Sequence, residues 1–394
     1  MKKDQMIKYY TTSILWSLIT LVVSGSMAQT FLLEYGLSEE KVTSLFSIMQ
    51  MAQVMTILCF SKFSDNLDSI VKTLVKTHLL DIPLCLVFMI LCVKSVENQS
   101  IVFLILLLTG GIFSISAGIN NVLAYKLPYK VMDMAYFGKF IAISGTLVGI
   151  FNVAFGMLSQ KLQSVMGYIP SMKYIVFCTL LFIPVYLVAT GTMKESPVAE
   201  NFTTTKEKIN ILKYKIFTAL VIPNVFRGFC AGMVGMTITI GYFTGLIDGS
   251  TANYVIIITN VMHIVSSFAF SKITQTIPDK YVLLGTSVVV AILLPLMTIG
   301  NTTLFLLLYT VLYFFYNVLN NAVPVTVAKI VDYKIAGQYS SGRMLLNTLG
   351  ISIAGFVSIP MFKAIGVVPT LIIAGAMQVI SGAGYYLVLK NREK

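Results

Sequence analysis

The sequence predicts an all-α polytopic membrane protein whose twelve transmembrane helices form two six-helix, pseudo-symmetric bundles. Hydrophobic residues make up 57% of the 394-residue chain and charged residues only 11%, too few to cover a water-exposed surface. The apolar residues fall into runs of about 20, the length of helix that crosses a bilayer core about 30 Å thick. Short patterns that recur in the two halves indicate the two bundles.

The apolar runs place the twelve helices in order along the chain. The predicted ranges are 10–33, 41–61, 74–94, 101–125, 136–160, 173–194, 213–242, 252–271, 281–299, 303–325, 340–362 and 366–389. One long polar connection separates the sixth run from the seventh. We therefore expect an N-terminal bundle over 1–194, a cytoplasmic linker over 195–212 and a C-terminal bundle over 213–394.

Three short patterns occur in the same order in each half. The pairs are Phe60-Ser61-Lys62 with Phe270-Ser271-Lys272, Asn120-Asn121 with Asn320-Asn321, and Gly138-Lys139 with Gly342-Arg343. Each pair alone has little weight, but all three fall on matching helices at a spacing near half the chain. Parallel repeats of this kind predict a solute site between the two halves.

The distribution of Lys and Arg predicts the topology. With the N-terminus inside, 22 of the 28 basic residues fall on inner segments, 5 on outer segments, and one, Arg227, inside a span. Cytoplasmic connections retain positive charge, so we expect both termini to be cytoplasmic. With 25 Lys against 3 Arg and short loops, we expect a bacterial inner membrane. The same asymmetry explains the net charge of +12, and no nucleic-acid partner is predicted.

This topology can be tested by chemical labelling of introduced cysteines. An impermeant thiol reagent on intact cells should label a cysteine at Asn301, between the ninth and tenth helices, and should leave one at Lys206 in the linker unlabelled. The reason is that only the outer side is accessible to the reagent. Labelling at Lys206 with protection at Asn301 would overturn the topology.

Several loop motifs resemble those of the major facilitator superfamily over essentially the full chain. Asp65, after the second helix, matches the acidic position of that superfamily's Gly-x-x-x-Asp-Arg loop. Leu127-Pro128-Tyr129 and Ile330-Val331-Asp332-Tyr333, with Gly342-Arg343 further on, are similar to motifs of its glycoside-pentoside-hexuronide:cation symporters. The resemblance implies a transporter in which helices 1, 4, 7 and 10 line a central cavity. That family binds its cation through acidic residues on helix 2, whereas Met49–Val54 holds no carboxylate, so we favour a proton over sodium.

Polar residues form stripes on the four helices that the resemblance places around the cavity. A polar side chain inside a bilayer needs a partner or water, so such stripes mark a solute pathway. The predicted substrate-binding residues are Trp16 and Thr20 on helix 1, Asn121 on helix 4, Asn224 and Arg227 on helix 7, and Tyr313, Tyr316 and Asn320 on helix 10. The alternatives are small-residue helix packing for helix 1 and an outer aromatic belt for the tyrosines.

Arg227 is the most informative of these residues, because it lies about ten residues into its helix and hence roughly 15 Å deep. Insertion scales assign about 2.5–3.5 kcal/mol against a lone arginine there. We predict that its parallel donors bind a carboxylate or similar anion of the substrate. The structural alternatives are an internal ion pair with Glu34 or Asp81, or water at a helix break near Pro223.

Ionisable residues inside the spans are also candidates for carrying the coupling cation. His78 and Asp81 lie three residues apart on helix 3, near the middle of the membrane, and His263 lies on helix 8. Buried carboxyl and imidazole groups can relay protons in transporters. The predicted coupling residues are therefore Asp81, His78 and His263, with a structural hydrogen bond as the alternative for the pair on helix 3.

Charged residues at the inner helix ends predict a gate. Asp65 follows helix 2 and Arg343 begins helix 11, while Asp279 follows helix 8 and Lys139 begins helix 5. We expect the contacts Asp65 with Arg343 and Asp279 with Lys139 to favour the outward-open state, because opposite charges would join the inner ends.

Three classes of function fit a chain of this kind. The repeat and the polar stripes favour a secondary active transporter that imports a small polar organic solute (a sugar, glycoside or sugar acid) by cation-coupled alternating access. A proton-coupled efflux antiporter for amphiphilic compounds is the alternative within transport, and a non-transporting receptor or scaffold is the alternative outside it.

Other classes of function lack their sequence signals. HExxH, GxSxG and paired-carboxylate motifs are missing, so no enzyme is predicted. The five cysteines fall inside spans without metal-ligand spacing, so we expect no metal and no cofactor. The expected partners are the solute, a proton or sodium ion and the lipid bilayer, and we expect the protein to be a monomer.

Overall fold

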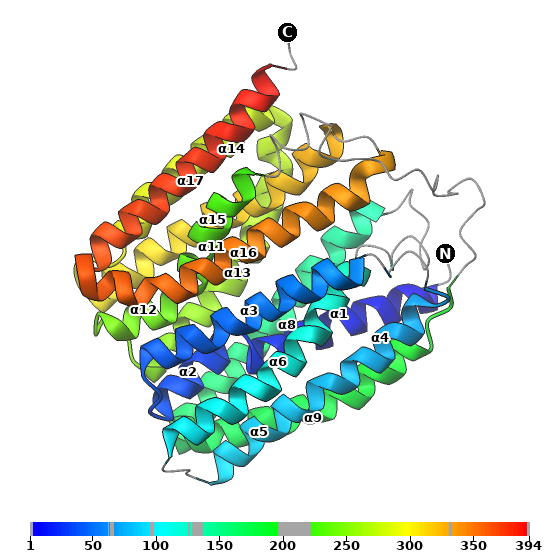
Figure 1. Ribbon diagram of the computed structural model, residues 1–394, viewed down its shortest axis with the longest axis vertical. Helices are drawn as coiled ribbons and strands as arrows, with labels where there is room; N and C mark the ends of the chain where they lie inside the picture. Colours follow the sequence, from blue (N-terminus) through cyan, green and yellow to red (C-terminus); the bar gives the residue numbers. More distant parts are fainter. Residues whose placement is uncertain are drawn as a thin grey trace. The chain divides into compact units, whose positions relative to one another are not determined.

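The computed structural model describes residues 3–61, 63, 67–94, 98–124, 127, 137–195, 222–330 and 333–391. All regular secondary structure in these ranges is helical (Figure 1). The chain divides into two compact units, Met1–Thr203 (unit 1) and Thr204–Lys394 (unit 2).

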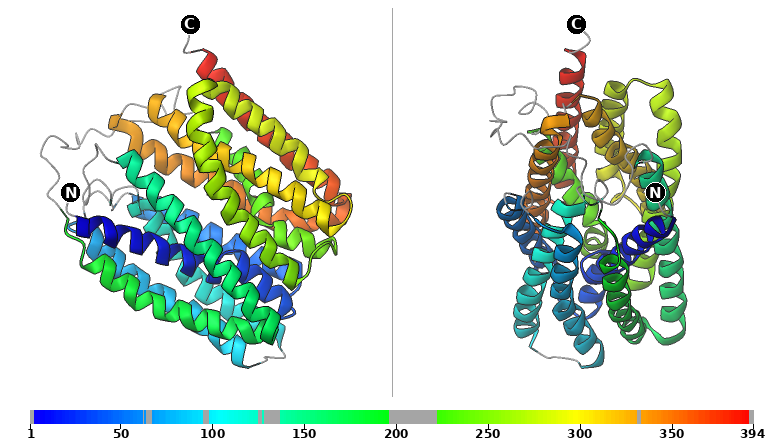
Figure 2. Two further views of the ribbon diagram at one scale, coloured as in Figure 1. Left: turned by 180° about the vertical axis from the view of Figure 1, so that it is seen from behind. Right: turned by 90° about the vertical axis from the view of Figure 1, so that its right-hand side faces the viewer.

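Unit 1 contains six apolar spans, of which the first and the third are broken. Its helices are α1 (Lys3–Val23), α2 (Ser26–Glu34), α3 (Glu39–Ser61), α4 (Ile70–His78), the 3₁₀ turn η2 (Leu79–Asp81), α5 (Ile82–Val93), α6 (Gln99–Ala124), α8 (Phe137–Met166) and α9 (Tyr168–Gly191). Within the unit, α1 lies along α9 and also contacts α8, while α3 packs against α6 (Figure 2).

The segment that follows α9 is fastened to the start of α4. The carboxylate of Glu195 accepts hydrogen bonds from the Ser69 hydroxyl at 2.6 Å and from the Val71 backbone N–H at 2.7 Å. The free N–H groups and positive dipole end of a helix favour such an anion. The beginning of the predicted linker is therefore held against unit 1.

Unit 2 contains the spans of the second half of the chain. Its helices are α11 (Pro223–Gly235), α12 (Thr237–Phe243), α13 (Gly249–Thr276), α14 (Asp279–Leu296), α15 (Thr302–Ile330), α16 (Tyr333–Ile365) and α17 (Val367–Lys390). α14 lies along α17, and their polar contact is fully buried: the Gln378 amide nitrogen donates to the Ser287 hydroxyl at 3.0 Å.

One turn has the same form in both units and supports their repeat relationship. α8 and α9 are joined by Gly167 alone, at φ +83°, and α16 and α17 are joined by Gly366 alone, at φ +91°. Glycine adopts this backbone conformation without strain. A proline follows three residues later in each case, at Pro170 and Pro369. Proline is tolerated there because the first turn of a helix does not need its N–H group.

The predicted spans are confirmed as elements, and the differences lie in their continuity. Eleven helices of the described ranges are long and apolar enough to cross a membrane, or twelve when α11 and α12, which meet at 55°, count as one span. The sequence predicted continuous helices over 10–33, 74–94 and 213–242. The structure breaks the first at Ser24–Gly25, the second at η2 and the third at Met236, and residues 213–221 lie outside the described ranges.

Local chemistry accounts for these breaks. The Thr20 carbonyl accepts both the Ser24 N–H at 3.0 Å and the Ser24 hydroxyl at 3.1 Å, next to Gly25. Such an added hydroxyl bond often bends a helix. Pro83, at the start of α5, has no N–H to continue the ladder from η2. Gly235 ends α11, where glycine weakens helix propagation.

Glycines bring α11 and α16 into backbone contact. A Cβ atom added at Gly228 would overlap the carbonyl oxygen of Asn347, and one added at Gly350 would overlap that of Val225. Close approach through small residues is typical of transmembrane helix pairs. It also fixes the position of Arg227, which directly precedes Gly228.

Replacing this glycine should destabilise unit 2. We expect Gly228→Ala to cost about 1–3 kcal/mol, because the added methyl group must push the two helices apart. The measurement is the melting temperature of the purified protein in detergent. Gly285→Ala on α14 is the matched control in the same unit, since a Cβ there meets nothing within 4 Å. Equal melting temperatures for the two variants would contradict the close packing.

Asp248 caps α13 just outside the membrane span that begins at Gly249. Its carboxylate accepts from the Thr251 N–H and the Ser250 hydroxyl, both at 2.8 Å, and these bonds lower the pKa of Asp248, that from Thr251 most strongly. A lowered folded-state pKa stabilises the fold above the usual value of about 3.9 and loses that contribution as the pH falls through the folded value.

This cap predicts a pH-dependent difference between two variants. Asp248→Ala should lose about 1 kcal/mol of stability at neutral pH, since the cap is removed. Asp248→Asn keeps a capping oxygen but cannot titrate, so its melting temperature should fall less than that of the wild type as the pH drops below about 4. Parallel pH profiles of wild type and Asp248→Asn would show that the carboxylate does not stabilise α13 by its charge.

Candidate functional site

Arg227 lies one turn into α11 and is almost completely buried, with 7% of its surface exposed. Its guanidinium donates a hydrogen bond to the side-chain oxygen of Asn320 on α15. The Nε atom of Arg227 has no acceptor among the described residues. Arg227 and Asn320, both predicted to bind substrate, are therefore in contact within unit 2, and this contact joins a permanent cation to a neutral amide.

The charge of Arg227 meets no carboxylate in the described part of unit 2. The acidic residues there are Asp248 and Asp279, which stand at the starts of α13 and α14. Both ion pairs recorded among the described residues belong to unit 1. Arg343 on α16 is close enough for its own positive charge to act on Arg227. A buried cation without a counter-charge is costly, so this environment favours an added anion.

Asn224 ties α11 to α17. The Tyr385 hydroxyl on α17 donates to the Asn224 side-chain oxygen at 3.0 Å, and neither residue is more than 1% exposed. A buried, paired amide of this kind rigidifies its surroundings. The predicted substrate residue Asn224 thus has a structural partner inside unit 2, and this partner holds the helix turn that carries Arg227.

Aromatic rings on α15 form a continuous ladder that ends beside Asn320. The ring centroids of Tyr309 and Tyr313 lie 5.4 Å apart, and those of Tyr313 and Tyr316 lie 5.7 Å apart. The Tyr309 hydroxyl is hydrogen-bonded to Thr259 on α13 at 2.7 Å. The spacing confirms that the predicted stripe occupies one face of the helix, and Tyr313 and Tyr316 are only half-buried.

The second buried polar cluster lies in unit 1, where the third span is broken. His78 Nδ1 and Asp81 Oδ2 are 2.7 Å apart, and each residue is 1% exposed. The ring of Trp16 on α1 lies 4.5 Å from the His78 ring, and that of Tyr186 on α9 lies 4.4 Å from it, both edge-on. The structure therefore brings the predicted substrate residue Trp16 into contact with the predicted coupling pair.

The remaining predicted residues of the site have separate surroundings. Thr20 donates its hydroxyl to the carbonyls of Trp16 at 3.0 Å and Ser17 at 2.9 Å. Asn121 is half-buried on α6. The His263 Nδ1 atom on α13 lies 3.4 Å from the Asn317 side-chain oxygen. The substrate role of Thr20 and Asn121 and the coupling role of His263 stay predictions.

The predicted gate is described only in part. Asp65 lies outside the described residues, and for Lys139 only the backbone, in α8, is described. Arg343 is half-buried on α16, and Asp279 is the first residue of α14. The contacts Asp65 with Arg343 and Asp279 with Lys139 stay predictions.

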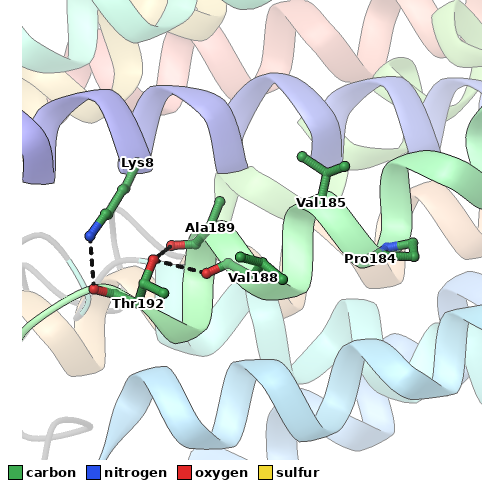
Figure 3. A pocket seen from close by; sticks show the side chains of 6 residues that line it. All are labelled: Lys8, Pro184, Val185, Val188, Ala189 and Thr192. Atoms are coloured by element: carbon green, nitrogen blue, oxygen red, sulfur yellow. Dashed lines mark hydrogen bonds between the residues drawn. The ribbon is translucent and has the colours of Figure 1, made fainter.

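A surface hollow on unit 1 is a weaker candidate. It has a volume of about 410 Å³ and lies between α1 and α9, lined by Lys8, Pro184, Val185, Val188, Ala189 and Thr192 (Figure 3). The Lys8 ammonium already donates to the Thr192 carbonyl at 3.1 Å and pairs with Asp4 at 3.0 Å. Because its other walls are apolar and Val188 is exposed, this hollow suits contact with lipid chains.

Sequence reasoning missed the residues that complete the two buried clusters. Tyr186 and Ser116 enclose the His78 ring, and Tyr385 holds Asn224. The hydrogen bonds join positions 38 and 161 residues apart in the chain. Helical periodicity within one span carries no signal for such contacts.

These features define a class of protein: a multi-pass, all-helical membrane protein of two helical units with buried charge inside its spans. No protein-family model and no curated protein sequence matches the chain. Solved structures do match it over nearly its full length.

Three solved transporters illustrate the match. A crystal structure of a point mutant of the nucleoside transporter NupG has a TM-score of 0.68 at 16% identity, covering 98% of this chain and 99% of that one. The D-xylose-proton symporter has a TM-score of 0.70 at 14% identity, with 96% of each chain covered. A variant of the E. coli fucose:proton symporter FucP has a TM-score of 0.64 at 12% identity, covering 99% and 98%.

The chain therefore has the major facilitator fold, as its motifs predicted, and its described residues hold eleven helices that could span a membrane, or twelve with α11 and α12 as one span. The three similar structures are of transporters and not of enzymes.

Proposed function

We propose that the protein is a secondary active transporter that imports a small polar organic solute by cation-coupled alternating access. The observation that carries this proposal is Arg227, a buried cation inside a span whose hydrogen-bond partner, Asn320, is neutral. Intramembrane ionisable residues without a structural counter-charge mark substrate or ion pathways. The fold supports the proposal, because the similar structures are symporters and a nucleoside transporter.

The chemistry around Arg227 favours an anionic solute, and among sugars, glycosides and sugar acids it favours the sugar acid. A guanidinium presents parallel donors that match both oxygens of a carboxylate. The Nε atom of Arg227, which lacks an acceptor among the described residues, is one of those donors. An anion bound there would also reduce the repulsion between Arg227 and Arg343.

A sugar acid also has a ring to be bound, and the tyrosine ladder offers a surface for it. Tyr313 and Tyr316 are half-buried rings that lead to Asn320. Aromatic rings combine an apolar face with a polar hydroxyl, so they can contact the C–H face of a sugar ring while the hydroxyl groups find hydrogen-bond partners. The ladder is therefore proposed to position the ring of the solute whose carboxylate Arg227 binds.

Two other functions remain as alternatives with different experimental signatures. A proton-coupled efflux antiporter for amphiphilic compounds would export rather than accumulate its substrate. A non-transporting receptor or scaffold would bind without flux. The charged, buried environment of Arg227 favours a polar anion over an amphiphilic cation, because like charges repel.

A ligand screen followed by a flux assay tests the proposal. Purified protein is screened by thermal shift against sugars, glycosides, sugar acids, nucleosides and amino acids, because a ligand that binds only the folded state raises the melting temperature. The best ligand is then tested for counterflow in proteoliposomes. A stabilising sugar acid that exchanges across the membrane supports the proposal. Binding without exchange favours the receptor, and accumulation only in the export direction favours the antiporter.

Arg227 itself gives the sharpest mutational test. Arg227→Lys keeps the charge but loses the fixed pair of donors, so we expect solute binding to weaken by more than about tenfold, which corresponds to about 1.4 kcal/mol. Expression and melting temperature should stay near the wild-type values. The measurement is the dissociation constant of the screened ligand by titration calorimetry.

A purely structural Arg227 would give the reverse pattern. Arg227→Lys would then bind normally, and Arg227→Leu would lose stability through its unpaired neighbour Asn320. Wild-type affinity in a stable Arg227→Leu protein would exclude both roles and indicate a neutral solute. Thr310→Val on α15 is a matched control, since among the described residues the Thr310 hydroxyl is bonded only to its own helix, at Leu306.

A further inference from the structure

The third span of unit 1 is interrupted at its middle, and the interruption holds two ionisable side chains. The span covers 24 residues, Ile70–Val93, and the turn η2 separates α4 from α5 at its centre. Side chains three residues apart lie nearly above one another in a 3₁₀ turn. This geometry brings His78, the last residue of α4, against Asp81.

The two side chains form one short hydrogen bond and leave one polar atom each without a partner. His78 Nδ1 lies 2.7 Å from Asp81 Oδ2. His78 Nε2 and Asp81 Oδ1 have no hydrogen-bond partner among the described residues, although both residues are 1% exposed. The pair is thus buried and incompletely satisfied, a combination that native proteins rarely keep without a functional reason.

Within the described part of unit 1, the surroundings of the pair are neutral. The helices packed around it are α1, α6 and α9, which present the Trp16 ring, the Ser116 hydroxyl at 3.5 Å from His78 Nδ1, and the Tyr186 ring. The titratable groups that act on the pair or on its neighbour Tyr186 are Tyr186 on α9, Cys85 on α5 and Tyr9 on α1. Phenols and thiols ordinarily titrate near 10 and 8.5, so they are neutral at physiological pH.

The number of protons on the pair therefore determines the charge at this place. With one proton, the imidazole and carboxyl groups together carry no net charge, whether the proton resides on nitrogen or on oxygen. Without it, they carry one negative charge in apolar surroundings, which is far less favourable than in water. While the pair is shielded from water, it should therefore keep one proton. Release of that proton requires water to reach His78 Nε2 or Asp81 Oδ1.

A direct contact links the pair to the helix that carries predicted solute residues. Trp16 packs edge-on against His78 and stacks on Phe113 of α6 with ring centroids 6.0 Å apart. The Thr20 hydroxyl, one turn further along α1, donates to the Trp16 carbonyl. A displacement of α1 by solute would therefore move the aromatic ring that covers the imidazole.

We propose that His78 and Asp81 form a single-proton site through which proton movement is coupled to solute transport. This inference rests on the proposed transport function. One proton binds the pair from the water on one side of the membrane and leaves to the water on the other, so the N–H or O–H bond formed in the first step is broken in the last. No other reactant is needed.

The proton site itself is tested without a solute. The chain holds two histidines, so ring-labelled histidine in full-length protein in lipid nanodiscs gives two sets of nitrogen signals, and His263→Asn assigns them. The ring nitrogen signals of His78, and not those of His263, should change when Asp81→Asn removes the carboxylate that is hydrogen-bonded to His78. Unchanged His78 signals in Asp81→Asn would overturn the shared-proton site.

Coupling is tested in proteoliposomes with D-glucuronate, D-xylose, L-fucose and uridine as probes. An inward gradient of one pH unit should concentrate a transported probe about tenfold in the wild type, since both ratios correspond to about 1.4 kcal/mol. Asp81→Asn removes the carboxylate that shares the proton with His78, so it should keep counterflow and lose the gradient-driven accumulation. Thr77→Val is the matched control, because in the described part of the chain the buried Thr77 hydroxyl is bonded only to the carbonyls of Thr73 and Leu74. It should keep both activities.

The other outcomes separate this proposal from the proposed function. Gradient-driven accumulation retained in Asp81→Asn would overturn the coupling role alone. Loss of both counterflow and accumulation in a stably folded Asp81→Asn would show a structural hydrogen bond instead. If Asp81→Asn lowers the melting temperature strongly, His78→Gln repeats the test. A wild type that exchanges none of the probes would count against transport, and the coupling proposal would fall with it, while the histidine titration would still report the proton site.

Discussion

The bilayer interior supplies neither water nor counter-ions, and this constraint governs every ionisable side chain inside the spans. The two units meet it in different ways. In unit 1, the base His78 and the acid Asp81 are hydrogen-bonded, with Nδ1 and Oδ2 2.7 Å apart, and one shared proton makes the pair neutral. In unit 2, Arg227 meets the neutral Asn320 and feels the like charge of Arg343. One proton would thus neutralise the pair in unit 1, whereas no carboxylate among the described residues of unit 2 meets the charge of Arg227.

Interruptions of the helices place this chemistry at membrane depth. A continuous helix satisfies all its backbone groups internally, so a break is tolerated in lipid only where protein or water surrounds it. η2 carries Asp81, and Arg227 lies on α11, the helix that ends at the 55° bend to α12. By contrast, α8 and α9 at Gly167, and α16 and α17 at Gly366, are unbroken helices joined by a one-residue turn. The two units thus combine repeated, regular hairpins with broken spans, and the buried charges lie on the broken ones.

The sequence predicted the spans well because bilayer thickness fixes their length, and it predicted the tyrosine face of α15 because helical periodicity is local. It did not predict η2. A proline such as Pro83 in an apolar run can either kink a helix or stand in the first turn of a new one, so the sequence alone does not show which occurs. Nor could it predict that Tyr385 holds Asn224 or that Trp16 covers His78, because these contacts join distant segments. Composition thus determines which residues are buried in spans, while their partners depend on tertiary packing.

The two proposed sites have a joint consequence for energy conversion. If Arg227 binds an anion with one negative charge and the His78–Asp81 pair carries one proton, the two cross together without net charge. The membrane potential then contributes nothing, and the pH gradient alone sets the accumulation. A neutral solute with the same proton would instead move one positive charge inward, which adds about 2.3 kcal/mol per 100 mV. Since Arg227 cannot lose its proton at physiological pH, the charge of its ligand decides between these two regimes.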